Sequence, residues 1–152
     1  MPTASLHIGE RVTRLVVRAD GASREFTLAL GLDRPGARPF ASLWPTETEL
    51  EAAIEAVEDI VMPLAREIAR GTALHTADPQ ARSVADWLAR PAGAVLTLDD
   101  VEASFRAMAD IAVGQPPSVS RLPAEPGLCA WVLIVRELMH HLGLGTLGIA
   151  AA

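Results

Sequence analysis

Eight consecutive apolar residues, from Leu128 to Val135, constrain the fold of this chain more than any other feature. A helix built from such a run has no polar face, so it must be covered on several sides. The run is far shorter than the ~18 apolar residues that indicate a membrane span. Polar residues follow it, and Gly143 is a typical helix stop. We therefore predict a buried helix over residues 127–142 at the centre of the core.

Length and composition are those of one folded domain over residues 1–152. The chain has 152 residues, and half of them are hydrophobic, which is enough to build a core without cross-links. Cys129 is the only cysteine, and the start of the chain lacks the basic and apolar regions of a signal peptide. We expect a cytoplasmic protein on these grounds. Lys, Asn and Tyr, whose codons are AT-rich, are absent, which favours a GC-rich bacterial genome.

The charged residues exclude several classes of function. The net charge is −6, all basic residues are arginine, and no basic stripe is visible along the chain. Nucleic-acid and membrane partners are therefore not expected. Without lysine, Schiff-base catalysis and the lysine of a Walker A loop are both impossible.

The first third of the chain has the pattern of β-strands. Apolar and β-branched residues fill 11–18 and 24–30, and the Asp20-Gly21 pair between them is typical of a tight hairpin turn. Leu6 and Ile8 either extend the first strand or form a third. We predict an antiparallel β-hairpin of two or three strands within about residues 5–31.

Helical spacing of apolar residues dominates the rest of the chain. Thr46 with Glu49, and Thr97 with Asp100, have the spacing of capping boxes, while Asp78 before Pro79 is a typical N-cap. Strands followed by helices indicate an α+β fold, here a hairpin packed with three to four helices. The predicted elements after the hairpin are helices over about 46–70 (interrupted at Pro63), 79–89, 98–113 and 127–142, then a Gly/Ala-rich tail over 143–152.

Glu137, His140 and His141 are the candidate metal ligands. Glu137 precedes His140 by three positions and His141 by four, so either pair could share one helical face. Adjacent residues point about 100° apart on a helix, so the two histidines are poorly placed to bind one ion together. The competing interpretation is structural, because histidines in a last helical turn interact favourably with the helix dipole. His7 and His75 are the other histidines that could complete a site.

Arg34 and Arg38 are the candidate ligand-binding residues. They flank Pro-Gly in a loop that precedes a helix, where two guanidinium groups could hold a carboxylate or phosphate. Cys129 lies near a helix N-terminus, which can lower a thiol pKa. The histidines of its helix are about 16 Å away, however, so a small buried side chain is the simpler interpretation.

The surplus of apolar surface leads to our functional expectation. An apolar helix and a hairpin with open edges both favour contact with another copy. We predict a non-enzymatic, self-associating interaction or assembly module, in the form of a homodimer. The alternative is a small metal-binding protein or enzyme centred on Glu137 with His140 or His141, or a binder of a small anionic ligand. No cofactor is strongly implied, although a divalent metal is compatible with the alternative.

Overall fold

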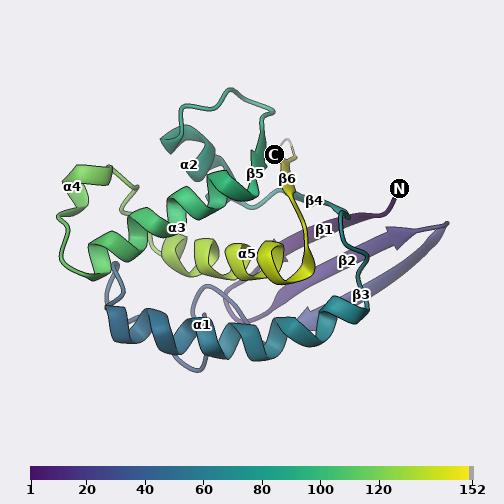
Figure 1. Ribbon diagram of the computed structural model, residues 1–152, viewed down its shortest axis with the longest axis horizontal. Coiled ribbons are helices and arrows are strands. Elements are labelled where there is room, and N and C mark those ends of the chain that lie inside the picture. The colour runs from purple at the N-terminus through teal and green to yellow at the C-terminus, as the bar shows by residue number, and fades with distance from the viewer. Residues whose placement is uncertain (151–152) are drawn as a thin grey trace.

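The computed structural model describes residues 1–150, which form a six-stranded mixed sheet with three long helices packed over one face (Figure 1). Its strands are β1 Thr3–Ile8, β2 Thr13–Ala19, β3 Ala22–Leu28, β4 Ala73–Thr76, β5 Val95–Thr97 and β6 Thr146–Ile149. Its helices are α1 Glu47–Val61, the 3-10 helix η1 Met62–Arg66, α2 Pro79–Trp87, α3 Leu98–Ala112, α4 Pro117–Ser120 and α5 Leu128–Leu142.

The sheet combines an antiparallel part with a parallel part. Its strand order is β3-β2-β1-β4-β6-β5. The first three strands are antiparallel, β1, β4 and β6 are mutually parallel neighbours, and β5 is antiparallel to β6. Parallel strands require long crossover connections, which the helices supply. The fold is therefore mixed α/β, and the prediction of an α+β fold with a small hairpin is only partly right.

The predicted hairpin is confirmed as the local unit β2–β3. Asp20 and Gly21 have φ angles of 53° and 75°, as a type I′ turn requires at its two central positions. Leu6 and Ile8 belong to a third strand, β1, in which Leu6 pairs with Leu15 of β2. The hairpin forms one end of the sheet, which continues beyond β1 because β4 pairs with the other side of that strand.

Three short strands were missed by the sequence interpretation. Strands β4, β5 and β6 have only three or four residues each, too few for an alternating pattern to emerge. Within the Gly/Ala-rich tail predicted over 143–152, residues 146–149 form β6 inside the sheet, and residues 151–152 lie outside the described part. Gly148 shows why a small residue is needed there, because a Cβ at this position would lie 2.6 Å from Nδ1 of His75.

The helix predictions hold closely. Both capping boxes are present, with Thr46 bonded to Glu49 and Thr97 bonded to Asp100. Helix α1 ends at Val61 and a 3-10 turn containing Pro63 follows, since proline cannot donate the hydrogen bond that an α-helix needs. Gly143 caps α5 in the left-handed conformation.

The apolar run at the start of α5 is the centre of the core. Its eight residues are all at most 4% exposed. Figure 1 shows α5 between α1 and α3, in front of the sheet, and α5 contacts both of these helices. The apolar character that suggested a subunit interface is thus explained within one chain. Among the helices of residues 1–150, none is long and apolar enough to cross a membrane.

The sheet has one buried and one open face. In β1, Ala4, Leu6 and Ile8 point into the core, while Ser5 and His7 are exposed. Strand pairing places Arg14 of β2 beside His7, and His75 of β4 beside Ser5, on the same open face. His7 is the last open-face residue of β1, so it lies near the carboxyl end of that strand.

Candidate functional site

The carboxyl ends of β1, β4 and β6 meet at one edge of the sheet, because these strands run parallel. In sheets of this kind, ligands bind in the crevice outside the carboxyl ends of the strands. The turn after β1 and the turn between β4 and α2 both lie at this edge. We call it the carboxyl edge.

Asp78 is the buried carboxylate of the carboxyl edge. Its side chain is only 2% exposed. Oδ2 accepts hydrogen bonds from the Ile8 amide and from Nε1 of Trp131, each at 3.0 Å. Oδ1 lies 2.7 Å from Nδ1 of His7. The sequence predicted an N-cap here, and Asp78 does occupy that position of α2, but its side chain makes no capping hydrogen bond and instead joins β1 to α5.

His7 is the exposed partner of Asp78. Its side chain is 68% exposed, while Nδ1 faces the buried carboxylate. The sequence interpretation had considered His7 only as a distant metal ligand and did not pair it with Asp78. The two residues are 71 positions apart and meet through the parallel pairing of β1 with β4. The available signal was local: a histidine between two core residues at a strand end.

The loop after β3 is anchored on the turn after β1. The Leu32 amide donates to the Gly9 carbonyl at 2.9 Å, and the Asp33 amide donates to the Glu10 carbonyl at 2.8 Å. Gly31 and Arg34 close this part of the loop by exchanging two backbone hydrogen bonds. The loop is therefore held at the carboxyl edge rather than hanging free.

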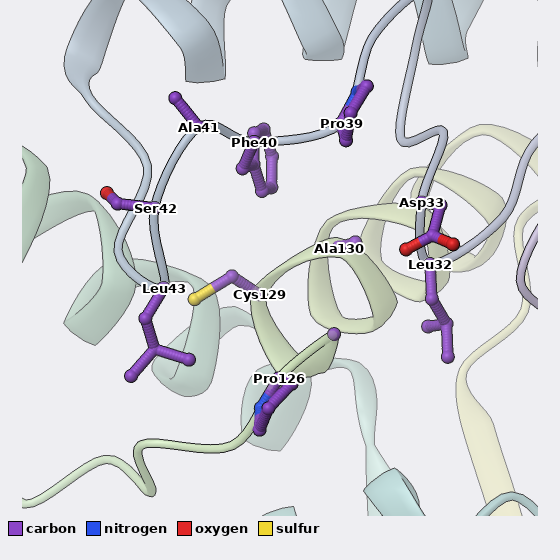
Figure 2. Close-up of a pocket in the computed structure, with 11 residues that line it drawn as sticks. Leu32, Asp33, Pro39, Phe40, Ala41, Ser42, Leu43, Pro126, Cys129 and Ala130 are labelled. Carbon is purple, nitrogen blue, oxygen red and sulfur yellow. The ribbon is translucent and has the colours of Figure 1, made fainter.

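A pocket of about 370 Å³ opens between this loop and the first turn of α5 (Figure 2). Cys129 and Ala130 line it from the helix, and Asp33, Phe40 and Ser42 line it from the loop. No side chain caps the N-terminus of α5. The amides of a first helical turn attract anions, although the Leu128 amide already donates to the Glu125 carbonyl at 3.2 Å and the Asp33 carboxylate lines the same pocket.

The two candidate arginines are exposed and do not line the same pocket. Arg38 lines a second pocket, of about 460 Å³, between residues 37–41 and α1. Arg34 sits in the closed turn against the carboxyl edge and lines neither pocket. Neither arginine forms a salt bridge with another residue of the described chain. The expectation that they hold one ligand jointly stays a prediction.

The thiol of Cys129 is a poor nucleophile in the folded protein. Its side chain is buried, and burial raises the pKa of the thiol to about 12. The sequence suggested that the helix N-terminus would lower this pKa, but desolvation of the buried thiol raises it. Cys129 is therefore a packing residue, and the thiolate that a nucleophile needs is not available near neutral pH.

Glu137 and His141 do meet, at the other end of α5. Nε2 of His141 lies 2.9 Å from Oε2 of Glu137 and 3.9 Å from Oε1 of Glu58. The three potential ligand atoms lie within 4.8 Å of one another. Glu58 was not among the ligands predicted from the sequence. Nη1 of Arg136 also bonds Oε1 of Glu137, at 2.8 Å.

His140 does not join this cluster. It is exposed, and its ring stands edge-on to that of His141, with centroids 5.1 Å apart. This divergence is what the 100° spacing of adjacent helical residues predicts. Of the three candidate ligands on α5, the structure thus brings together two and turns the third away.

Comparison with known proteins identifies the fold. Neither a protein-family model nor a curated protein sequence matches this chain. A structure of an Aquifex aeolicus Ppx/GppA phosphatase does match, with a TM-score of 0.74 and 17% identity, over 98% of this chain and 53% of that one. The chain is similar in fold to about half of a Ppx/GppA phosphatase.

Two further structures agree with this likeness. An exopolyphosphatase-like protein matches with a TM-score of 0.66 and 14% identity, over 100% of this chain and 56% of that chain. An exopolyphosphatase from Cytophaga hutchinsonii matches with a TM-score of 0.65 and 10% identity, over 98% of this chain and 53% of that chain. The described chain therefore spans about half the length of these proteins, and at such identities the likeness establishes the fold.

The likeness to Ppx/GppA phosphatases contradicts the predicted function. A non-enzymatic assembly module was inferred from an apolar helix and an open hairpin, yet the same fold occurs as part of phosphatases. The structure also accounts for the apolar helix, because α5 is covered by α1 and α3 within the chain, whereas β3 remains an edge strand of the sheet. Pairing with a second copy, and the absence of nucleic-acid and membrane partners, stay predictions.

Proposed function

We propose that this chain binds a phosphate-bearing ligand at the carboxyl edge of its sheet and takes part in phosphate-ester or polyphosphate hydrolysis. The observation that carries the proposal is the likeness to a Ppx/GppA phosphatase over 98% of the chain. The same edge holds the α5 N-terminus, which suits an anion, and the exposed His7. The solved structures that it resembles are about twice as long as this chain.

Binding is tested first, with defined phosphate compounds. Purified protein is titrated with inorganic phosphate, pyrophosphate and polyphosphate, with thermal shift and calorimetry as the two readouts. A ligand that binds only the folded state raises the melting temperature by mass action. Saturable binding of a phosphate compound is expected. Absence of any binding in both readouts, together with absence of phosphate release from polyphosphate, contradicts the proposal.

A charge variant locates the ligand. Ser42→Asp adds a negative charge to the pocket beside the α5 N-terminus, and we expect it to weaken phosphate binding about tenfold, or about 1.4 kcal/mol. Ser23→Asp is the matched control, because Ser23 is exposed and pairs with Arg18 in β2, at the opposite end of the sheet. Equal weakening by both variants would place the ligand elsewhere.

A divalent cation at Glu58, Glu137 and His141 is a second candidate. The observation that favours it is the approach of one imidazole nitrogen and two carboxylate oxygens within 4.8 Å. Carboxylate and imidazole groups are ordinary ligands of zinc and manganese. The cluster lies at the far end of α5 from the pocket, so this cation would stabilise the packing of α1 against α5.

Elemental analysis and thermal shift test the cation. Zinc or manganese is expected to bind and to raise the melting temperature, and His141→Ala is expected to abolish both effects. His140→Ala is the matched control, since His140 is exposed on the same helical turn. If no metal binds the wild-type chain, the cluster is an ion-paired network alone.

A further inference from the structure

The His7–Asp78 pair has the geometry of a proton-transfer device. Oδ2 of Asp78 is occupied by two donors, the Ile8 amide and Trp131 Nε1. Only Oδ1 remains for His7, which approaches it through Nδ1 at 2.7 Å. A carboxylate fixed by bonds from both the backbone and a buried indole cannot turn away from the imidazole. The fixed carboxylate therefore sets the orientation of the imidazole ring.

This contact determines which ring nitrogen of a neutral His7 holds the proton. An ionised carboxylate only accepts hydrogen bonds, so Nδ1 must carry the hydrogen. Nε2 then has a free lone pair. Gly9 has no side chain to cover this nitrogen, whereas a Cβ at that position would lie in van der Waals contact with it, at 3.8 Å. With 68% of the side chain exposed, Nε2 is accessible at the carboxyl edge.

The charges around His7 come from the neighbouring strands and turns. Asp78 faces it from the turn after β4, and Arg14 of β2 is its cross-strand neighbour on the open face. The Arg14 guanidinium is engaged with Glu25 of β3, with Nε 2.6 Å from Oε1. Glu10 follows in the turn after β1 and is exposed. Among these groups, Asp78 is the one that contacts the ring.

We infer that His7 is the proton acceptor for water attack on a phosphate group held at the carboxyl edge, with Asp78 as its positioning residue. The inference rests on the proposed function for its substrate class. Nε2 takes a proton from water as the water oxygen forms a bond to phosphorus. The bond from phosphorus to the leaving oxygen breaks, that oxygen departs on the phosphate anion, and the imidazolium gives its proton to the solvent. His7 ends the cycle neutral, as it began.

The first test does not depend on activity. Nitrogen-15 correlation spectra of the full chain report the protonated ring nitrogen of each neutral histidine. We expect the Nδ1–H form for His7. His75 is the internal control, because it is exposed on the neighbouring strand and has no hydrogen-bonded carboxylate within residues 1–150. Finding the Nε2–H form for His7 overturns the inference, because Nε2 would then have no lone pair to accept a proton.

The second test uses hydrolysis of polyphosphate. His7→Gln is expected to lower kcat by about 100-fold with little change in KM, the usual loss for a removed general base. His75→Gln, the same change on the same face, is expected to retain wild-type kcat. Both side chains are exposed, so neither change should prevent folding. Asp78→Asn is expected to lower kcat and to shift His7 toward the Nε2–H form, as a positioning role requires.

The outcomes separate this inference from the proposed function. If the wild-type chain binds and hydrolyses polyphosphate and His7→Gln does so equally well, the proton-acceptor role is wrong and the proposed function stands. If the wild-type chain neither binds nor hydrolyses any phosphate compound, the proposed function is wrong and the reaction assigned to His7 falls with it.

Discussion

The indole nitrogen of Trp131 donates a hydrogen bond to Oδ2 of Asp78 across 3.0 Å, and both side chains are buried. This bond links the central helix α5 to the turn after β4. It also holds the carboxylate that His7 contacts, so the core and the candidate site share one residue. A substitution at Trp131 is therefore expected to change the position of the Asp78 carboxylate at the carboxyl edge.

Trp131→Phe should lower the free energy of unfolding by about 2 to 4 kcal/mol. The change removes one donor from a buried carboxylate and leaves space in the core, and both effects destabilise the folded state. Urea denaturation measures the loss. Trp87→Phe is the matched control, because the half-buried Trp87 donates only to the neutral carbonyl of Ser120, at 2.8 Å. Equal losses in the two variants would mean that the bond to Asp78 adds no more to the free energy of unfolding than the bond from Trp87 to Ser120.

Gly31→Ala should destabilise the protein by about 1 to 3 kcal/mol, the usual cost of forcing extra atoms into a packed position. A Cβ at Gly31 would overlap the Glu10 carbonyl oxygen and lie 2.5 Å from the Arg11 amide nitrogen. The loop must then leave the turn after β1. A melting curve shows the effect, and phosphate binding should weaken with it. Gly145→Ala, where an added Cβ has open space, should be nearly neutral; a wild-type-like Gly31→Ala would refute this packing.

Cys129 should resist alkylation in the folded protein at pH 8. Burial raises its thiol pKa to about 12, so the reactive thiolate is scarce well above neutral pH. The rate of iodoacetamide labelling, followed by mass spectrometry, should be low in buffer and should rise to that of an ordinary thiol in denaturant. Rapid labelling of the folded chain would show that the start of α5 opens readily.

Asp100→Asn should lower stability near neutral pH by about 1 kcal/mol, the usual worth of a helix cap. Burial by itself would raise the Asp100 pKa, but hydrogen bonds from the Thr97 amide and Arg90, with the Arg90 charge, lower it below its usual range. Because the folded-state pKa is lowered, the stabilisation is present above the unfolded-state pKa. It is lost as pH falls through the folded-state value.

The pH dependence of unfolding therefore tests the Asp100 cap. Denaturation curves recorded from neutral to acidic pH should show a smaller acid-induced loss for Asp100→Asn than for the wild type. Asp99→Asn is the matched control, because Asp99 is the exposed preceding residue of the same helix. An identical acid-induced loss in wild type and Asp100→Asn would be incompatible with the lowered pKa.

Local features of the fold were predictable because nearby residues determine them. The type I′ turn at Asp20-Gly21, the capping box at Thr46 and the glycine cap at Gly143 each depend on a few consecutive residues. The interruption of the first helix at Pro63 is of the same kind. In each case the required dihedral angles or hydrogen bonds are local, so the pattern is visible without the fold.

The candidate sites were predictable only within one helix. Glu137 and His141 are four residues apart on α5, so helical spacing predicted their contact. Glu58 joins them from α1 through helix packing, and no pattern around Glu58 distinguishes it from the exposed glutamates of the same helix. His7 and Asp78 are brought together by the pairing of two strands across 71 positions. That pairing could not be inferred, because β4 is only four residues long.

The sequence alone determined the hairpin, the helices and the burial of the Leu128–Val135 run, since periodicity, turn residues and apolar content are properties of short segments. The tertiary structure alone decided that the hairpin extends into a six-stranded sheet with three parallel strands. It also decided that the buried side chain of Asp78, at the N-cap position of α2, contacts His7 instead of capping the helix. The physical reason is that a short strand gains most of its stability from its neighbours in the sheet, and those neighbours are distant in the chain.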